Sequence, residues 1–118
     1  MRRAAVLLLL LLSGWPVAAP AQQDRTPLTD QQKLGRRIFE QRCAVCHTLV
    51  LASGKTYGPT LSKELIAGNE DAMRDFIKNG SPGKMPGFKY GLEPQEIDAI
   101  VAYLGILPKP RPPSRPGA

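Results

Sequence analysis

The two cysteines and the only histidine of the chain lie in one short segment, Cys43-Ala44-Val45-Cys46-His47. This C-x-x-C-H spacing is the attachment signature of c-type haem. On a helical turn, residues three apart share a face, so both thiols can form thioethers with the two vinyl groups of one haem. His47 can then offer Nε2 to the iron. The motif predicts one haem c, covalently bound through Cys43 and Cys46.

Other uses of the same residues are a disulfide, a thioredoxin-like redox pair and a structural zinc site. An oxidising compartment would favour the disulfide unless another chemistry claims the thiols. A thioredoxin-like pair needs a βαβ setting, which this chain lacks. Structural zinc takes four ligands, and Cys43, Cys46 and His47 supply only three. Haem is therefore the preferred interpretation.

A second axial ligand to the iron cannot be histidine, because His47 is the only one. Beyond the N-terminal apolar segment, the methionines are Met73 and Met85. Met73 falls in an apolar stripe with Phe76 and Ile77, which is typical of core packing. Met85 lies in a Gly-Lys-Met-Pro-Gly loop, and we expect it to be the distal ligand, so that the metal ligands are His47 and Met85. The alternative is a loop methionine that only covers the haem edge.

The elements around these residues are expected to be helical. Thr29 to Gln32 matches a capping box, followed by an apolar stripe that predicts a helix over residues 30–42. A short helix is expected after Ser62, and another between an Asn69 cap and Gly80. The last helix opens at Glu93-Pro94 and carries the clearest apolar stripe, with Ile97, Ile100, Val101 and Leu104.

The segments at 48–61 and 81–92 are rich in Gly and Pro and are predicted to be loops. No alternation typical of strands is present, so the predicted fold class is all-α, with three to four short helices. A body this small buries a modest fraction of its unfolded surface. A large apolar cofactor at its centre would supply the missing core.

The chain divides into four segments by composition. Residues 1–21 have the layout of a secretory signal, with Arg2 and Arg3 before an apolar run too short to span a bilayer. Residues 22–28 form an irregular lead-in, 29–107 the folded domain, and 108–118 a Pro-rich tail that is expected to be disordered. The signal predicts export to the periplasm.

The formal net charge of the 118-residue chain is +6. Arg2 and Arg3 would leave with the signal, and Lys109, Arg111 and Arg115 lie in the tail, so the body itself is nearly balanced. A nucleic-acid-binding protein needs a concentrated basic face. The composition therefore argues against nucleic acid as a partner.

The order of motifs resembles that of class I cytochromes c. The resemblance covers residues 34–107 and rests on Cys43 to His47, Gly58 to Leu61, Lys84 to Phe88 and a terminal helix with Tyr103. It implies the class I fold, with short helices and loops wrapped around one covalently bound haem. It also implies that the Pro59 carbonyl accepts a hydrogen bond from Nδ1–H of His47, which makes Pro59 part of the cofactor site.

The resemblance further implies that the first and last helices cross closely, with Gly35 and Phe39 against the helix of Tyr103. Tyr57 and Tyr90 either form hydrogen bonds to the haem or serve only as packing side chains.

The expected function is a one-electron carrier with iron cycling between Fe²⁺ and Fe³⁺, and not an enzyme. Its partners would be redox proteins, as donor and acceptor, with no small-molecule substrate and with membranes reached only through partners. We expect a monomer. Lys78, Lys84 and Lys89 could guide an acidic partner or could belong to a solvated loop. The alternatives are a subunit of a periplasmic dehydrogenase or oxidase, and a haem enzyme or sensor with a displaceable distal ligand.

Overall fold

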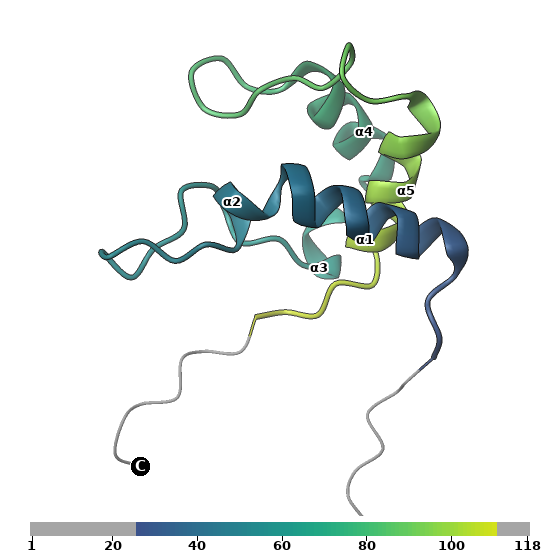
Figure 1. The fold of residues 1–118 in the computed structure, drawn as a ribbon, viewed down its shortest axis with the longest axis horizontal. Helices are drawn as coiled ribbons and strands as arrows, with labels where there is room; N and C mark the ends of the chain where they lie inside the picture. Colours follow the sequence, from purple (N-terminus) through teal and green to yellow (C-terminus); the bar gives the residue numbers. More distant parts are fainter. Residues whose placement is uncertain (1–25, 111–118) are drawn as a thin grey trace, which may run out of the picture.

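The computed structural model describes residues 26–110 and shows a small helical domain (Figure 1). The predicted signal, residues 22–25 of the lead-in and residues 111–118 of the tail lie outside the described residues. The domain contains five helices, in the order α1 (Asp30–Arg42), α2 (Ala44–His47), α3 (Lys63–Ile66), α4 (Glu70–Asn79) and α5 (Pro94–Leu104).

The two helices that frame the domain, α1 and α5, begin at capping boxes, and the box at Thr29 was predicted. Thr29 accepts a hydrogen bond from the Gln32 backbone N–H, and the Gln32 side chain accepts one from the Thr29 N–H. Glu93 and Glu96 make the same reciprocal pair at α5, with Pro94 in the first turn. These boxes satisfy backbone donors that a helix start leaves without partners.

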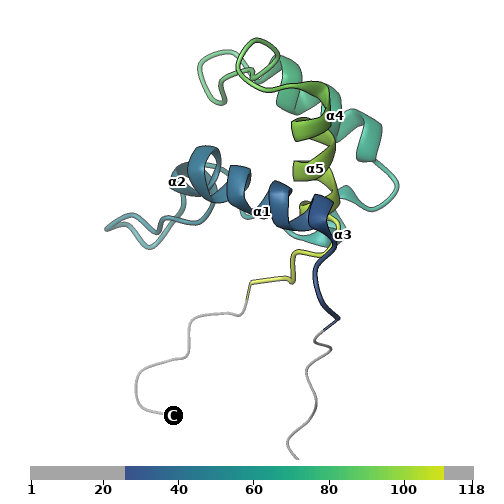
Figure 2. The same cartoon turned by 45° about the vertical axis from the view of Figure 1, so that its right-hand side comes forward.

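Helices α1 and α5 cross and form the main helix contact of the domain (Figures 1 and 2). At the crossing, Gly35 lies against the backbone of Ala99 so closely that a β-carbon on Gly35 would overlap the Ala99 carbonyl. One turn further along α1, the rings of Phe39 and Tyr103 pack with centroids 5.6 Å apart. The close crossing that the resemblance implies is therefore present.

The apolar core lies where α1, α3, α4 and α5 meet. Its buried side chains are aliphatic except for Phe39, and half of them come from α5, whose predicted stripe is buried along its length. The buried members are Ile38, Phe39, Ile66, Ile77, Ile97, Ile100, Val101 and Leu104.

Three details differ from the sequence-based expectations. The C-x-x-C-H segment forms a helix of its own, α2, so residues 26–110 contain five helices rather than three to four. Asn69 precedes α4 as predicted, but its side chain does not cap the helix and instead bonds the Ala67 carbonyl. Phe76 was expected on the buried face of α4, yet it is 49% exposed. Only the assembled domain shows that Phe76 faces a cavity and not the core.

The 48–61 and 81–92 segments are loops, as predicted, and each contains one isolated β-bridge. One bridge joins Val50 to Thr56 and the other joins Ser81 to Met85. Because residues 26–110 contain no longer strand, the all-α class is confirmed.

Within residues 26–110, no helix has the length and apolar character needed to cross a membrane.

Candidate functional site

One cavity of about 730 Å³ opens between α1, α2, α4 and the loops that flank them. Cys43, Cys46, His47, Pro59 and Met85 all line it, although they are up to 42 positions apart in the chain. The fold therefore brings together every site residue predicted from the sequence. Most of the remaining wall is apolar and includes Leu61, Leu65, Met73, Phe76, Phe88 and Ile100.

The size and chemistry of this cavity fit a haem. Cofactor and ligand sites in proteins typically occupy about 300–1,000 Å³ and combine an apolar lining with a few polar groups. Protein interiors are otherwise close-packed, so a domain this small gains little from a large hollow next to its core. An apolar disc would bury Leu65 and Phe76, which are 51% and 49% exposed without it.

The cysteine thiols stand at the cavity wall, and neither forms a disulfide. Burial raises the pKa of the Cys43 thiol to about 11, and the neighbouring Cys46 thiol adds to the increase. Across residues 26–110, no three His, Cys, Asp or Glu side chains gather into a metal-binding group.

His47 is the one buried polar side chain among the described residues, at 8% exposed. It comes from the last position of α2, and its Nδ1 lies 2.7 Å from the Pro59 carbonyl oxygen. Because a carbonyl can only accept, Nδ1 must carry the proton, which leaves the Nε2 lone pair for another partner. A neutral imidazole with a free Nε2 is a good metal ligand.

Gly58 and Thr56 belong to the site, although no role in it was predicted for either residue. A β-carbon on Gly58 would lie 2.9 Å from Cε1 and 3.0 Å from Nδ1 of His47, so the glycine backbone lies directly against the ring. The Thr56 hydroxyl donates to the Gly58 carbonyl at 2.6 Å. A glycine before a proline was the only sequence signal for this contact, and Thr56 had none.

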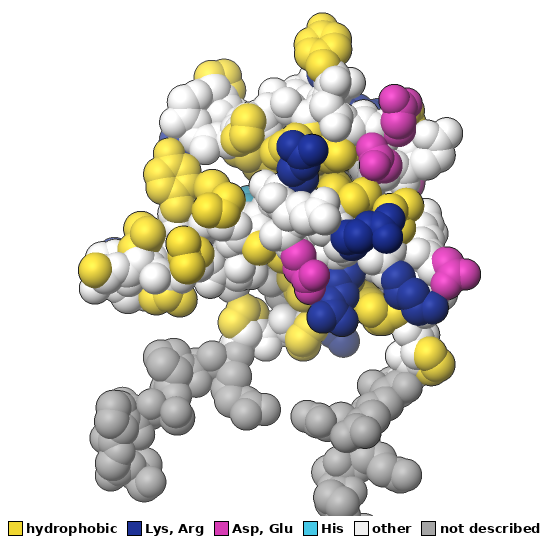
Figure 3. All heavy atoms as spheres, viewed as in Figure 1, with side chains coloured by type: hydrophobic (Ala, Val, Ile, Leu, Met, Phe, Trp, Pro, Cys, Tyr) yellow, Lys and Arg dark blue, Asp and Glu magenta, His cyan; other side chains and the backbone are white. Residues whose placement is uncertain are grey.

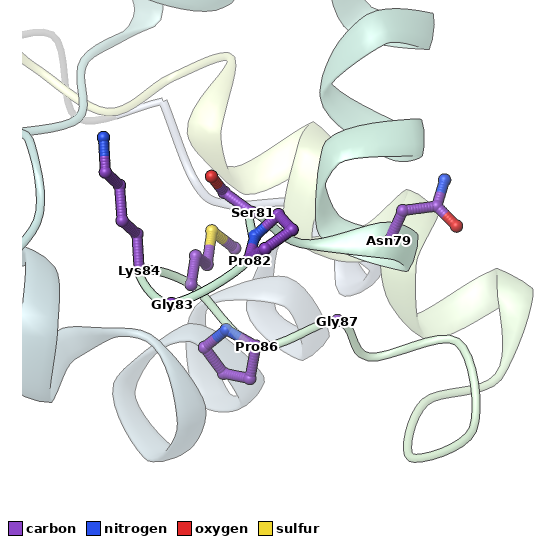
Figure 4. Close-up of a pocket in the computed structure, with 8 residues that line it drawn as sticks. Asn79, Ser81, Pro82, Gly83, Lys84, Pro86 and Gly87 are labelled. Atoms are coloured by element: carbon purple, nitrogen blue, oxygen red, sulfur yellow. The ribbon is translucent and has the colours of Figure 1, made fainter.

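The turn that carries Met85 is fixed by backbone contacts to the end of α4. Ser81 N–H donates to the Met85 carbonyl at 2.8 Å, and Phe88 N–H donates to the Ile77 carbonyl at 3.0 Å. A β-carbon on Gly87 would lie 2.7 Å from the carbonyl oxygens of Lys78 and Asn79. Figure 4 shows this turn, whose residues also line a separate hollow of about 450 Å³.

Both candidate methionines line the larger cavity, Met73 from α4 and Met85 from the turn. Each is partly buried and packs against the core. The structure thus places Met73 at the cavity wall as well as at the core, and the cavity lining alone does not choose between the two thioethers.

The roles of Tyr57 and Tyr90 could not be chosen from the sequence, and the two side chains lie in different places. Tyr57 lines the cavity and is 64% exposed. Tyr90 is 93% exposed, does not line the cavity, and lies under the Lys89 ammonium at 5.0 Å from the ring centroid. Tyr90 therefore belongs to the surface, with a cation–π contact as its partner.

Comparisons with known proteins show which family this chain resembles. Residues 30–104 match the family model described as cytochrome C oxidase, cbb3-type, subunit III. A cytochrome c6 from Limnospira maxima is 33% identical over 76 residues, which cover 59% of this chain and 85% of the relative. The solved cytochrome c6 from the diatom Phaeodactylum tricornutum is 32% identical, with a TM-score of 0.48 over 62% of this chain and 88% of that chain.

A longer relative is the quinohemoprotein alcohol dehydrogenase ADH IIB of Pseudomonas putida. It is 29% identical over 115 residues, which cover 88% of this chain. The chain spans only 16% of the length of that relative.

The family match covers more than half of the chain and includes every residue of the C-x-x-C-H motif. The chain therefore belongs to the cbb3-type cytochrome c oxidase subunit III family, and it is a class I c-type cytochrome with one haem c bound covalently through Cys43 and Cys46.

Proposed function

We propose that this protein is an electron carrier that holds its haem iron between His47 and Met85, and that it transfers single electrons without converting a substrate. His47 and Met85 would hold the iron from the protein side and would leave no position for a small molecule to bind it. The predicted signal at 1–21 supports the periplasm as the place where this occurs, with the folded domain at 29–107.

The observation that carries the proposal is the hydrogen bond between His47 and Pro59. The 2.7 Å contact holds the proton on Nδ1 and directs the opposite ring nitrogen away from the Pro59 carbonyl. A hydrogen bond of this kind fixes the tautomer and ring orientation of a metal-bound histidine and raises its basicity. The burial of His47 supports the same role, since an unused imidazole would be better solvated at the surface.

The other residues of the site hold and shield the cofactor. Cys43 and Cys46 anchor it covalently, and the apolar wall keeps water from most of its surface. The haem supplies a reversible Fe²⁺/Fe³⁺ couple, whose potential is raised by Met/His ligation. Met85 is the preferred thioether because its turn has no apolar stripe to fill, whereas Met73 shares its helix with buried Ile77.

The proposed partners are redox proteins, one donor and one acceptor. Most of this chain aligns with part of an alcohol dehydrogenase, which supports a dehydrogenase as donor. A role as a bound subunit of such an enzyme is the second candidate, and the same alignment favours it.

The charged side chains in Figure 3 gather over α1, whereas the loop after α2 presents mainly hydrophobic side chains. Lys84 lines both the cavity and the separate hollow at the Met85 turn, and its ammonium group is suited to an acidic partner.

The proposal is tested by replacing each methionine in turn. Ferric wild-type protein should show the weak near-infrared band of sulfur-to-iron charge transfer, and the ferrous form should resist carbon monoxide at neutral pH. Met85→Ala should lose the band, fall in potential and bind carbon monoxide readily, because a soft thioether favours ferrous iron. Met73→Ala, the matched control, should keep the band and lower stability by up to about 2–5 kcal/mol.

Two outcomes would contradict the proposal in different ways. Rapid carbon monoxide binding by the wild-type protein would show an open or displaceable position and would favour an enzyme or sensor. Loss of the band in Met73→Ala, with the band retained in Met85→Ala, would make Met73 the ligand and leave the carrier function intact.

A further inference from the structure

Two hydrogen bonds join the 56–59 segment to the helical turn that carries His47, and a third lies within the segment. The Thr56 hydroxyl donates to the Gly58 carbonyl at 2.6 Å. The Gly58 N–H donates to the Cys46 carbonyl at 2.7 Å, and Nδ1–H of His47 donates to the Pro59 carbonyl at 2.7 Å. Thr56 is thus the first member of a short chain of contacts that ends at the imidazole.

The covalent geometry between Gly58 and Pro59 makes this chain of contacts stiff. The peptide bond is planar, and residues 26–110 contain no cis bond, so the direction of the Gly58 carbonyl fixes the plane that contains the Pro59 nitrogen. The proline ring then holds φ of Pro59 near −65°. Only ψ of Pro59 remains between that plane and the carbonyl that accepts the His47 proton.

The imidazole also has little room to follow a movement of this turn. The Gly58 backbone packs against the ring, where even one added carbon would come within 2.9–3.3 Å of three of its atoms. A rotation of the Gly58 carbonyl would therefore change both the hydrogen bond at Nδ1 and the surface on which the ring rests.

Thr56 is well placed to prevent such a rotation. Its backbone pairs with Val50 across a short hairpin that also contains the bond from the Leu51 N–H to the Lys55 carbonyl, at 2.8 Å. The residue is half-buried, so its hydroxyl is partly protected from competing water. The Gly58 carbonyl precedes a proline, and within 26–110 its contact with Thr56 is the one side-chain hydrogen bond that orients it.

We propose that Thr56 is a positioning residue for the proximal ligand, acting on His47 through the carbonyls of Gly58 and Pro59. The inference rests on the proposed function, in which His47 binds the iron. Loss of the Thr56 hydroxyl should weaken the bond between His47 and Pro59 and make the imidazole a less basic ligand. A less basic ligand stabilises ferric iron less, so the reduction potential should rise.

The experiment compares Thr56→Val, which keeps the shape of the side chain, with Thr56→Ser, which keeps the hydroxyl, in the haem-loaded full chain. Thr60→Val, at an exposed threonine of the same loop, is the control. Thr56→Val should raise the reduction potential, so that the ratio of ferrous to ferric protein at a fixed ambient potential increases at least twofold. A twofold change corresponds to about 18 mV, because tenfold corresponds to 59 mV for one electron. The Nδ1 proton of His47 in the ferrous protein should exchange faster with D₂O. Thr56→Ser and Thr60→Val should behave as wild type in both measurements.

A lower melting temperature in Thr56→Val, with the potential and the proton exchange unchanged, would overturn the inference and leave Thr56 a structural residue. If Thr56→Val does not fold, equal potentials of Thr56→Ala and Thr56→Ser would overturn it in the same way. Failure of the proposed function would be seen separately, because wild-type protein would then lack the NMR signals of an iron-bound His47.

Discussion

Gly35 of α1 and Ala99 of α5 meet backbone to backbone, with no space between them for a β-carbon. Glycine inside a helix costs about 1 kcal/mol relative to alanine, so the residue is unfavourable for α1 itself. The close approach explains its presence, because it lets Phe39 and Tyr103 pack one turn away. The crossing holds α1 and α5 together beside the site.

Gly35→Ala should therefore destabilise the protein even though alanine is the better helix former. The added methyl must push α1 away from α5, and overpacking of this kind typically costs about 1–3 kcal/mol. Urea denaturation monitored by circular dichroism would measure the loss. The control is Gly91→Ala, where nothing lies within 4 Å of the added carbon. Equal stabilities of the two variants would show that the crossing can open without cost.

Covalent attachment through Cys43 and Cys46 predicts that denatured protein keeps its colour in acid acetone. Thioethers survive conditions that extract non-covalent haem, so the double variant Cys43→Ala with Cys46→Ala should lose its colour on the same treatment. The measurement is the absorbance of the precipitated protein after co-expression with a haem-attachment system. Colourless wild-type protein that is correctly folded would contradict haem binding altogether.

Gly58→Ala should disturb His47 without releasing the cofactor. The new β-carbon would lie within 3.0 Å of Cε1 and Nδ1, which is closer than side chains normally approach, so the ring or the turn must move. We expect a changed reduction potential and altered His47 signals in NMR, with the acid-acetone colour retained. Gly91→Ala again serves as the control, and an unaltered potential in Gly58→Ala would show that the turn yields instead of the ring.

Ionisation of Tyr103 should lower the stability of the folded protein at alkaline pH. Burial raises the pKa of Tyr103 and outweighs the opposing effect of Arg36, while Glu40 adds a smaller increase. The unfolded chain, with an ordinary tyrosine pKa of about 10, therefore loses this proton at lower pH than the folded chain. The contribution of protonated Tyr103 to the free energy of unfolding is complete below the unfolded-state pKa. It is lost as the pH rises through the folded-state pKa.

The measurement is the free energy of unfolding of wild type and Tyr103→Phe between pH 9 and pH 11, an interval of about one unit on each side of the ordinary value. The variant should lose less stability across this interval than wild type. Parallel curves for the two proteins would show that ionisation of Tyr103 is not coupled to folding.

The helix boundaries could be predicted because their causes are local in the chain. The capping boxes at Thr29 and Glu93 need only residues three positions away, and the Gly80 C-cap needs only its own backbone freedom at a φ of 68°. The C-x-x-C-H motif is local for the same reason. Asn69 was placed correctly before α4, but its side chain found a different local acceptor, which position alone does not reveal.

The cavity could not be predicted in the same way, because its wall joins segments that are distant in the chain. Phe76 has the spacing of a core residue on α4, and only the packed domain shows that it faces the cavity. Met73 has the same spacing and lines the same cavity, so the periodicity that marked it as core did not exclude it from the site.

By itself, the sequence determined the helical class, the attachment motif and the set of residues available to hold an iron, since residue type and short spacing carry that information. Only the tertiary structure decided how these groups are oriented. The backbone of Gly58 reached the His47 ring, and the Thr56 hydroxyl reached the Gly58 carbonyl, once the 50–56 hairpin had closed against α2. Such contacts depend on where a loop returns to the domain, and no pattern of neighbouring residues specifies that position.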